Sequence, residues 1–389
     1  MFASLVGAYP RTPLPGQPFR SRSAHARLER GEIDEAAFRA VQDELVREVM
    51  AEQLDAGLQL LTDGQVRWDD QQTVIASGLR GFEITGLLRY FDTNTYFRQP
   101  RAVEVPRWES SITVTDWLFA HETAAALADE RGLEAPPVKQ CVVGPYTLGW
   151  LSDPGEIGRE RLVLALAEAL NEELHALRAA GAPVIQLDEN ALTLIAPDDD
   201  AERRLAGDAL RRVMQGLEDT HVCLSVTMGD AVGAGPDVLF DAPFRSHLFD
   251  LIAGPDNWEL IAQAPHERGI VCGVANARNT MPDDESAMIR AAHYAASTQA
   301  RGLERVALAP STSLEYLPRD RAKAKIEALA EAARKAAITD PEELARQMDS
   351  RAVDIRSAAV GRHVPPSEGP GGPTTSAAPA AAAAQGSAR

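Results

Sequence analysis

The chain has 389 residues, of which 45% are hydrophobic and 25% charged, and this composition is that of a globular protein with enough chain for a large core. Its net charge of −18 argues against a nucleic-acid partner, because phosphate binding needs a basic face. Three cysteines are too few for a disulfide framework, and no stretch reaches the roughly 18 apolar residues of a membrane helix. We therefore expect a cytoplasmic protein that acts on a small molecule. Nothing in the sequence indicates an oligomeric state.

Short apolar runs alternate with longer segments of helical period along most of the chain. The predicted strands are 3–8, 58–63, 138–143, 183–188, 221–226, 247–253, 269–275 and 303–309, and the predicted helices include 34–56, 159–180, 199–217, 282–300 and 319–337. Strands that alternate with helices indicate a parallel sheet, and a count of eight favours closure. The predicted fold class is α/β, a (β/α)8 TIM barrel.

Two segments depart from this rhythm. Residues 65–112, after the second strand, are too long for a connector, and the aromatic stretch 90–97 predicts an ordered hairpin over the barrel mouth. Its aromatic side chains could cover a pocket, stack on a flat ligand or simply pack. The Pro-, Gly-, Ser- and Ala-rich end of the chain cannot bury enough apolar surface to fold. We predict a catalytic barrel over 1–340, a C-terminal helix over 341–363 and a disordered tail over 364–389.

Polar residues gather at almost every predicted strand end, where the catalytic residues of such barrels lie. These groups are Tyr9-Pro10-Arg11, Asp63-Gly64-Gln65-Val66-Arg67, Gly144-Pro145-Tyr146-Thr147, Gln186-Leu187-Asp188-Glu189-Asn190, His221-Val222-Cys223, Asn276-Ala277-Arg278 and Pro310-Ser311-Thr312-Ser313. The pattern predicts an active site at the barrel mouth.

Two of these groups carry the chemistry. His221 and Cys223 point to one face of a strand-like run that we expect to end at the mouth, and an imidazole and a thiol so placed are half of a tetrahedral zinc site. Asp188 and Glu189 are the acid/base candidates, with a structural pairing to an arginine as the alternative. Arg11 could bind a ligand carboxylate or brace the first loop.

Five segments resemble the cobalamin-independent methionine synthase family. They are Val6-Gly7-Ala8-Tyr9-Pro10-Arg11, Thr62-Asp63-Gly64, Gly144-Pro145-Tyr146-Thr147, Ile185-Gln186-Leu187-Asp188-Glu189 and Leu314-Glu315-Tyr316-Leu317-Pro318-Arg319. The likeness is to the family's C-terminal catalytic barrel in its core-only form, from about Ser4 to Lys335. It implies a zinc ion that binds the acceptor thiol as a thiolate, and a methylated folate or a corrinoid as methyl donor.

The chain departs from that family pattern at the presumed ligands and in the pocket. His221 and Cys223 match the family's His-x-Cys pair, but Thr312 stands where a second cysteine is expected. The expected glutamate has no counterpart in 249–255, where Asp250 is the nearest carboxylate. Gln65 and Asn276 replace two carboxylates, which removes negative charge that would hold the ammonium group of homocysteine.

The sequence therefore predicts a divergent methyl or alkyl transferase that acts on a small thiol-type acceptor other than homocysteine. Its predicted catalytic residues are Asp188, Glu189, His221 and Cys223, its substrate-binding residues are Tyr9, Arg11, Gln65, Arg67, Tyr146, Asn276, Arg278 and Thr312, and its metal ligands are His221 and Cys223. Two alternatives stay open. One is a metal-free lyase, decarboxylase or hydrolase on the same barrel, and the other is a non-catalytic binding protein.

Overall fold

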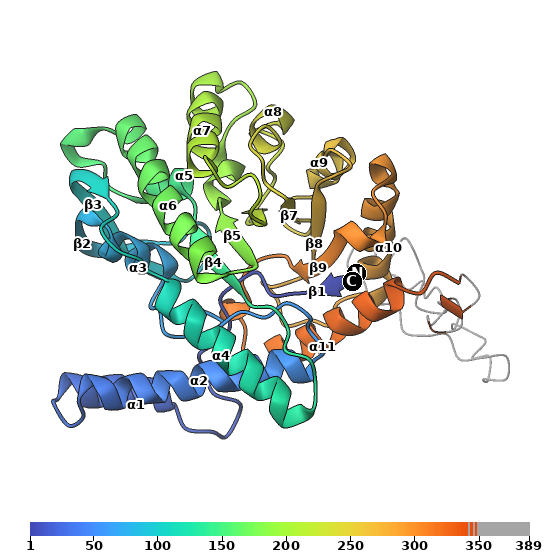
Figure 1. Ribbon diagram of the computed structural model, residues 1–389, viewed down its shortest axis with the longest axis horizontal. Coiled ribbons are helices and arrows are strands. Elements are labelled where there is room, and N and C mark those ends of the chain that lie inside the picture. The colour runs from blue at the N-terminus through green and yellow to red at the C-terminus, as the bar shows by residue number, and fades with distance from the viewer. Residues whose placement is uncertain (341–342, 345–346, 348–389) are drawn as a thin grey trace, which may run out of the picture.

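A curved sheet of seven parallel strands lies at the centre of the molecule, and helices surround it (Figure 1). The computed structural model describes residues 1–340, 343–344 and 347. The strands run in the order β1 (Phe2–Ala3), β9 (Val306–Pro310), β8 (Gly269–Ala275), β7 (Ser246–Asp250), β6 (Val222–Val226), β5 (Val184–Asp188) and β4 (Lys139–Val143). This confirms a parallel α/β architecture. The helix and the disordered tail predicted for 341–389 fall outside the described residues, apart from 343–344 and 347.

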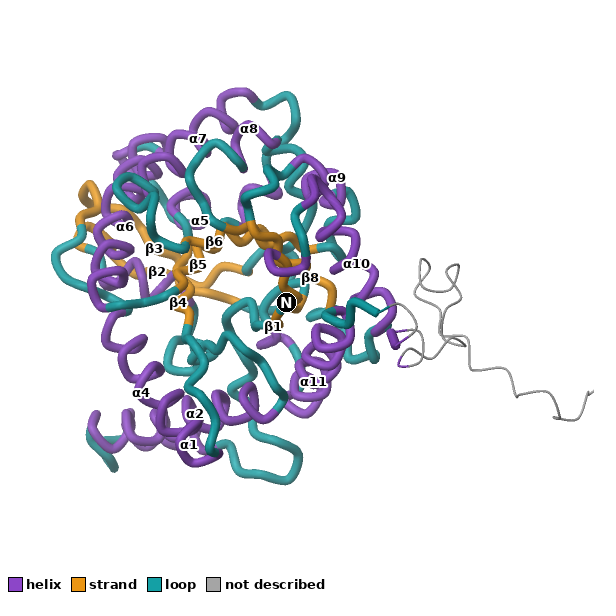
Figure 2. Tube along the Cα trace, turned by 45° about the vertical axis from the view of Figure 1, so that its right-hand side comes forward, coloured by secondary structure: helices purple, strands orange, loops and turns teal. Residues whose placement is uncertain are grey.

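The helices form an outer layer around the strands (Figure 2). They are α1 (Arg20–Glu29), α2 (Glu35–Asp55), α3 (Gln71–Gly78), α4 (Val114–Arg131), α5 (Pro145–Leu151), α6 (Arg159–Ala180), α7 (Asp200–Val213), α8 (Pro236–Leu239), α9 (Asn257–Gln263), α10 (Glu285–Ser297) and α11 (Arg319–Ala336). Aspartate side chains that accept backbone N–H groups cap several helix starts, as Asp34 does for α2 and Asp284 for α10. None of the described helices has the length and apolar character needed to span a bilayer.

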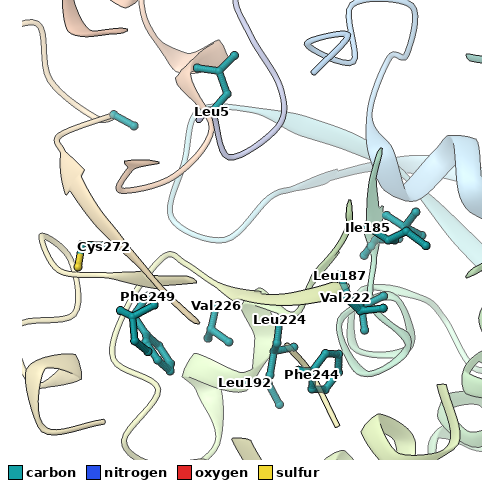
Figure 3. Packing of buried hydrophobic residues seen from close by; sticks show 14 of the residues in the cluster. Leu5, Ile185, Leu187, Leu192, Val222, Leu224, Val226, Phe244, Phe249 and Cys272 are labelled. Atoms are coloured by element: carbon teal, nitrogen blue, oxygen red, sulfur yellow. The ribbon is translucent and has the colours of Figure 1, made fainter. Parts of the chain in front are cut away.

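Side chains of β6 alternate between the outer, helix-covered face of the sheet and its concave face. Val222, Leu224 and Val226 pack in the main hydrophobic core with Phe244 and neighbouring side chains (Figure 3). The intervening Cys223 belongs to a separate small cluster with Val6, Leu248 and Ala309, which come from other strands and from the segment after β1. Because successive residues of a strand point to opposite faces, Ser225 shares the concave face with Cys223.

The strand predicted for 58–63 does not form as a regular strand. Leu60 makes a single parallel bridge to Ser4, and Leu61 makes one to Val138, so this segment contacts both edges of the seven-stranded sheet. The backbone groups of the next residue, Thr62, bind the fully buried side chain of Gln53 in α2. Gln53 Oε1 accepts from the N–H of Thr62 at 3.0 Å, and Gln53 Nε2 donates to the carbonyl of Thr62 at 2.8 Å. A side chain thus replaces the ladder that a neighbouring strand would supply.

The insertion predicted at 65–112 contains an ordered hairpin, as expected. β2 (Arg80–Arg89) and β3 (Tyr96–Arg107) pair antiparallel, with Leu88 opposite Phe97. A carboxylate fixes the chain that follows this hairpin: Glu173 of α6, fully buried, accepts hydrogen bonds from Trp108 Nε1, the Ile112 N–H, the Thr113 N–H and Thr113 Oγ1 at 2.7–2.8 Å. The hairpin is therefore attached to the outer helical layer at its base.

Candidate active site

A pocket opens where the parallel strands end, at what we call the carboxyl edge of the sheet. The segments that follow β1, β5, β6 and β9 line it together with the 65–72 segment and the hairpin. The lining residues, which we call the edge pocket, are Val6, Ala8, Gln65, Trp68, Asp69, Asp70, Gln71, Gln72, Tyr90, Thr95, Tyr96, Phe97, Asp188, Asn190, Thr227, Thr312, Ser313, Glu315 and Tyr316. They include four carboxylates and five aromatic rings, and none of them is Lys, Arg or His.

Asp188 and Glu315 are the carboxylates that differ most in their surroundings. Asp188 Oδ1 accepts from Gln186 Nε2 at 2.7 Å, and its Oδ2 accepts from Gln71 Nε2 at 3.1 Å. Glu315 has no hydrogen-bond or ion-pair partner within the part of the chain that the structure describes. Burial raises the pKa of both carboxyl groups, although the two amides oppose this for Asp188. Burial therefore makes both carboxyl groups better proton acceptors than an exposed carboxylate.

Thr227 and Thr312 bring two hydroxyl groups together in the lining of the edge pocket. Their Oγ1 atoms lie 3.1 Å apart. Thr227 donates to Asn190 Oδ1 at 2.9 Å through its hydroxyl, and the Asn190 Nδ2 donates to the Tyr90 hydroxyl at 2.9 Å. A chain of neutral hydrogen-bonding groups therefore leads from β9 to the hairpin.

The tip of the hairpin is attached to the carboxyl edge by an ion pair as well. Arg278 Nη1 lies 2.8 Å from Asp92 Oδ1, and Arg278 Nη2 donates to the Asp92 carbonyl at 3.3 Å. With the Tyr90–Asn190 hydrogen bond, this pair holds the hairpin across the pocket. Arg278 therefore fastens the hairpin; it does not line the pocket as predicted.

We expect Arg278→Ala to loosen the hairpin. An exposed ion pair stabilises by about 0.5–1 kcal/mol, so amide hydrogens of β2 and β3 should exchange about two- to fivefold faster. Hydrogen exchange read by mass spectrometry measures this. Arg245→Ala, which removes a 3.8 Å pair with Asp219 elsewhere, is the matched control. Equal hairpin exchange in both variants would contradict the role of Arg278.

His221 and Cys223 are not at the carboxyl edge. β6 begins at Val222, so His221 precedes the strand and Cys223 is its second residue. His221 Nε2 lies 2.9 Å from Ser246 Oγ at the start of β7, and Cys223 pairs in register with Gln186, two residues before Asp188. The predicted placement is wrong because a parallel strand presents its last residues at this edge, and here those are Ser225 and Val226, with Thr227 directly after them.

Glu189 is buried away from the edge pocket and caps a helix. It accepts hydrogen bonds from the Tyr146 N–H at 3.0 Å, the Thr147 N–H at 2.7 Å and Thr147 Oγ1 at 2.6 Å, at the start of α5. Burial raises its pKa to about 7. Only glycine fits at 144, because a Cβ there would lie 2.2 Å from Glu189 Cδ. Glu189 therefore does not line the edge pocket, and its catalytic role stays a prediction.

Three more predicted substrate-binding residues are engaged in the scaffold. The Tyr9 hydroxyl donates to Glu52 at 3.1 Å. Tyr146, fully buried, donates its hydroxyl to Glu202 at 2.6 Å. Arg67, whose side chain is 1% exposed, forms ion pairs with Asp43 and Asp116. None of the three lines the edge pocket.

Arg11 and Asn276 lie near the carboxyl edge but outside the lining. Arg11 donates to the backbone carbonyls of Trp68 and Asp69, and so braces the loop that carries them. Asn276 Oδ1 accepts from the backbone N–H of Arg278 at 2.9 Å. Of the predicted site residues, Asp188, Gln65 and Thr312 are thus the ones that line the edge pocket.

The ligand set that the resemblance implies for zinc does not fit this geometry. His221 and Cys223 lie at the opposite end of β6 from Thr312. Both oxygens of Asp250 accept backbone N–H groups, from Met228, Ile252 and Ala253. Among the described residues, no three His, Cys, Asp or Glu side chains are grouped so that they could hold a metal ion. The hydroxyls of Thr227 and Thr312, which do meet, are poor zinc ligands.

The site also contains residues that sequence reasoning did not single out as functional. They are Tyr90, Asn190, Thr227, Glu315 and Tyr316. Glu315 and Tyr316 lie within a motif that resembles the family, and Tyr90 begins the aromatic stretch predicted over the mouth. The sequence therefore contained features that could have identified these three residues. Thr227 carried none, because a threonine at a strand end is common in any sheet.

A parallel α/β fold with a pocket at the carboxyl edge of its sheet is typical of α/β enzymes. Comparison with known proteins shows which family of this class the chain belongs to. Residues 67–299 match the family described as cobalamin-independent synthase, N-terminal domain. The chain is 30% identical over 227 residues to the methionine synthase of Pyrococcus furiosus and 27% identical over 221 residues to that of Saccharolobus solfataricus. Each match covers 57% of this chain and 61% of the relative, so it spans about three-fifths of the relatives' length.

Solved structures show the same fold. A B12-independent methionine synthase from Shewanella sp. W3-18-1, in complex with selenomethionine, superposes with a TM-score of 0.69 at 18% identity, over 88% of this chain and 98% of that one. A putative vitamin-B12-independent methionine synthase from Listeria monocytogenes gives 0.65 at 16% identity, over 86% and 97%.

The chain belongs to the cobalamin-independent methionine synthase family. The family predicted from the motifs is thereby confirmed. The matching family description is that of the N-terminal domain, whereas the motifs resemble the C-terminal barrel. The motifs at 6–11, 62–64 and 314–319 lie outside the matched residues.

Proposed function

We propose that this protein transfers a methyl or other alkyl group to a small thiol-type acceptor in the edge pocket, and that homocysteine is not that acceptor. The observation that carries the proposal is the convergence of Asp188, Glu315 and the Thr227–Thr312 hydroxyl pair at the carboxyl edge of a methionine-synthase-family fold. The thiol and the class of donor, a methylated folate or a corrinoid, rest on the family. Gln65, a neutral amide in the pocket lining, supports the exclusion of homocysteine.

The pocket suits the following step without a metal ion. A carboxylate, Asp188 or Glu315, takes the proton of the acceptor thiol. The Thr312 hydroxyl donates to the thiolate, while Thr227 keeps its hydrogen bond to Asn190 Oδ1. The sulfur then forms a bond to the methyl carbon as the bond from that carbon to the donor breaks. The electron pair of the broken bond stays with the donor, and where the donor is a folate the carboxyl group gives its proton to the leaving nitrogen. The hairpin excludes water while this occurs. General-base catalysis of this kind contributes about 10²–10⁴ in rate.

The proposal includes three finer statements about the molecule. Residues 1–340 form one catalytic (β/α)8 barrel, and the bridges of Leu60 and Leu61 to the two edge strands support its closure. The protein acts in the cytoplasm. Its partner is a small molecule, and the net charge of −18 speaks against nucleic acid.

A methyl-transfer assay tests the proposal. Purified protein is incubated with methyltetrahydrofolate or methylcobalamin and a panel of thiols that includes homocysteine, and products are read by mass spectrometry. We expect transfer to a thiol other than homocysteine, reduced at least 100-fold in Asp188→Asn or Glu315→Gln and unchanged in Glu267→Gln, an exposed carboxylate far from the pocket in sequence. Faster methylation of homocysteine than of any other thiol would contradict the acceptor, and full activity of Asp188→Asn would contradict the site.

A second function is favoured by one observation. The carboxylates of the pocket lie together, whereas the residues expected to bind zinc do not. This arrangement also suits a metal-free lyase, decarboxylase or hydrolase. Consumption of a carboxylic acid substrate without alkyl transfer, abolished by Asp188→Asn, would select this alternative. Tight ligand binding without any turnover would instead indicate a binding protein.

A further inference from the structure

A lysine is buried inside the curve of the sheet, at the end opposite the edge pocket. Lys139 is the first residue of β4, and the residue is 5% exposed. Its Nζ donates to Gln186 Oε1 at 2.6 Å and to the backbone carbonyl of Leu5. No carboxylate pairs with it among the described residues. Burying an unpaired ammonium is costly, so its place in the fold calls for a reason.

Gln186 connects this lysine to the edge pocket. The side chain is 1% exposed, and its Nε2 donates to Asp188 Oδ1 at 2.7 Å and to the Val6 carbonyl at 2.5 Å. Its orientation is determined by chemistry: an ammonium only donates, and a carboxylate and a carbonyl only accept. A reversed amide would place NH2 against the ammonium and oxygen against the carboxylate. The relay Lys139–Gln186–Asp188 therefore has one direction.

The relay spans the inside of the sheet from one end to the other. In the pairing of β4 with β5, Lys139 is opposite Val184, Cys141 opposite Gln186, and Val143 opposite Asp188. Lys139 thus lies two layers below Asp188, about 13 Å along the strands at roughly 3.3 Å per residue. The Lys139 side chain does not contact Asp188, and Gln186 forms hydrogen bonds to both.

The other ionisable groups around Asp188 do not favour its charged form. Tyr90, Tyr316, Cys141, Cys223 and Glu189 each interact with it, and burial raises the pKa of all five. Phenols and thiols held neutral in this way supply no positive charge. The hydrogen bonds of Gln71 and Gln186 and the charge of Lys139 act in the opposite direction and limit the rise that burial causes in the pKa of Asp188.

We propose that Lys139 is a positioning residue which, through Gln186, holds Asp188 in the edge pocket as an ionised hydrogen-bond acceptor. Asp188 then receives a proton or a donor group from a bound ligand; it does not start as a proton donor. The catalytic use of Asp188 rests on the proposed function, but the state of its carboxyl group does not.

The test measures Asp188 directly, by carbon NMR of protein labelled at the aspartate carboxyl carbons, with the Asp188 signal assigned by its loss in Asp188→Asn. We expect Lys139→Met to raise the proton affinity of Asp188 at least tenfold, and Gln186→Met to do the same. Lys325→Met, which removes another buried lysine bound to Asp283 and the Met281 carbonyl, should leave the titration unchanged.

Each outcome decides one question. An Asp188 titration that is the same in folded Lys139→Met as in the unsubstituted protein would overturn the proposal and leave Lys139 a packing residue. Should Lys139→Met not fold, Lys139→Gln decides in the same way, because it keeps a donor for Gln186 Oε1 and removes the charge. A confirmed relay in a protein that transfers no methyl group would leave this inference standing and refute the proposed function.

Discussion

Replacement of Glu173 by alanine is expected to lower the free energy of unfolding by about 3–5 kcal/mol. The substitution removes a fully buried carboxylate and leaves four donors without a partner, the Trp108 indole, the N–H groups of Ile112 and Thr113, and the Thr113 hydroxyl. Each buried donor left unsatisfied costs about 1–3 kcal/mol, and partial access to water reduces the sum. Urea unfolding followed by circular dichroism measures the loss.

Two variants control this experiment. Glu172→Ala changes the exposed neighbour on the same helix and should alter stability by less than about 0.5 kcal/mol. Glu173→Gln keeps one carbonyl acceptor but turns its NH2 toward a donor, so an intermediate loss is expected. Equal unfolding midpoints for Glu173→Ala and Glu172→Ala would show that the four hydrogen bonds do not hold the native chain.

The same substitution should also affect the edge pocket. Glu173 fixes the segment that follows β3, and the hairpin contributes Tyr90, Tyr96 and Phe97 to the lining. With that segment released, two attachments near the tip remain, Tyr90–Asn190 and Asp92–Arg278. We therefore infer that a residue outside the pocket controls how firmly the pocket is covered.

The elements that were predicted well have strong local signals. α6 and β8 form with the predicted bounds, Arg159–Ala180 and Gly269–Ala275. In α6, apolar residues recur with helical spacing over many turns, and Gly181 in the left-handed conformation ends the helix. β8 is a short run of apolar residues. The segment 58–63 has a similar apolar run, but it makes only single bridges at Leu60 and Leu61, and Gln53 binds the backbone groups of Thr62. An apolar pattern does not reveal a hydrogen bond from one polar side chain.

The candidate site was predicted only in part, because the sequence does not show which end of a strand faces the pocket. Apolar runs locate strands, yet the chemistry of a parallel sheet depends on which end of each strand a residue occupies. His221 was predicted to be a metal ligand, although it directly precedes β6, whereas Thr227, which directly follows β6, was not predicted to be functional and lines the pocket. Asp188 was placed correctly because it is the last residue of β5.

The pH dependence of stability is expected to change strongly when His247 is replaced. The imidazole is fully buried against Phe240, Phe244 and Phe249, with Nε2 2.9 Å from the Leu239 carbonyl. Burial lowers its pKa from 6.5 to about 3. As the pH falls from 6.5 to 3, the unfolded chain binds a proton that the folded chain does not, so this group reduces stability by about 1.4 kcal/mol per pH unit.

His247→Phe removes this titration together with one hydrogen bond. We expect the variant to be less stable than the parent at pH 7.5 and to gain on it by about 1.4 kcal/mol per pH unit below 6.5, measured as urea midpoints. Glu189→Gln should show the opposite trend. Because burial raises the pKa of Glu189 from 4.5 to about 7, the folded state holds a proton between those values that the unfolded state releases.

The two opposite slopes separate the causes. Glu189 adds stability as the pH falls from 7 to 4.5. Over that range the stability of Glu189→Gln relative to the parent should therefore fall, while that of His247→Phe should rise. A general weakening of the fold by either substitution would displace the whole curve without changing its slope. Parallel curves for His247→Phe and the parent would therefore mean that the imidazole takes up its proton in the folded state as readily as in the unfolded chain. Its burial behind three phenylalanines makes that result incompatible with the structure.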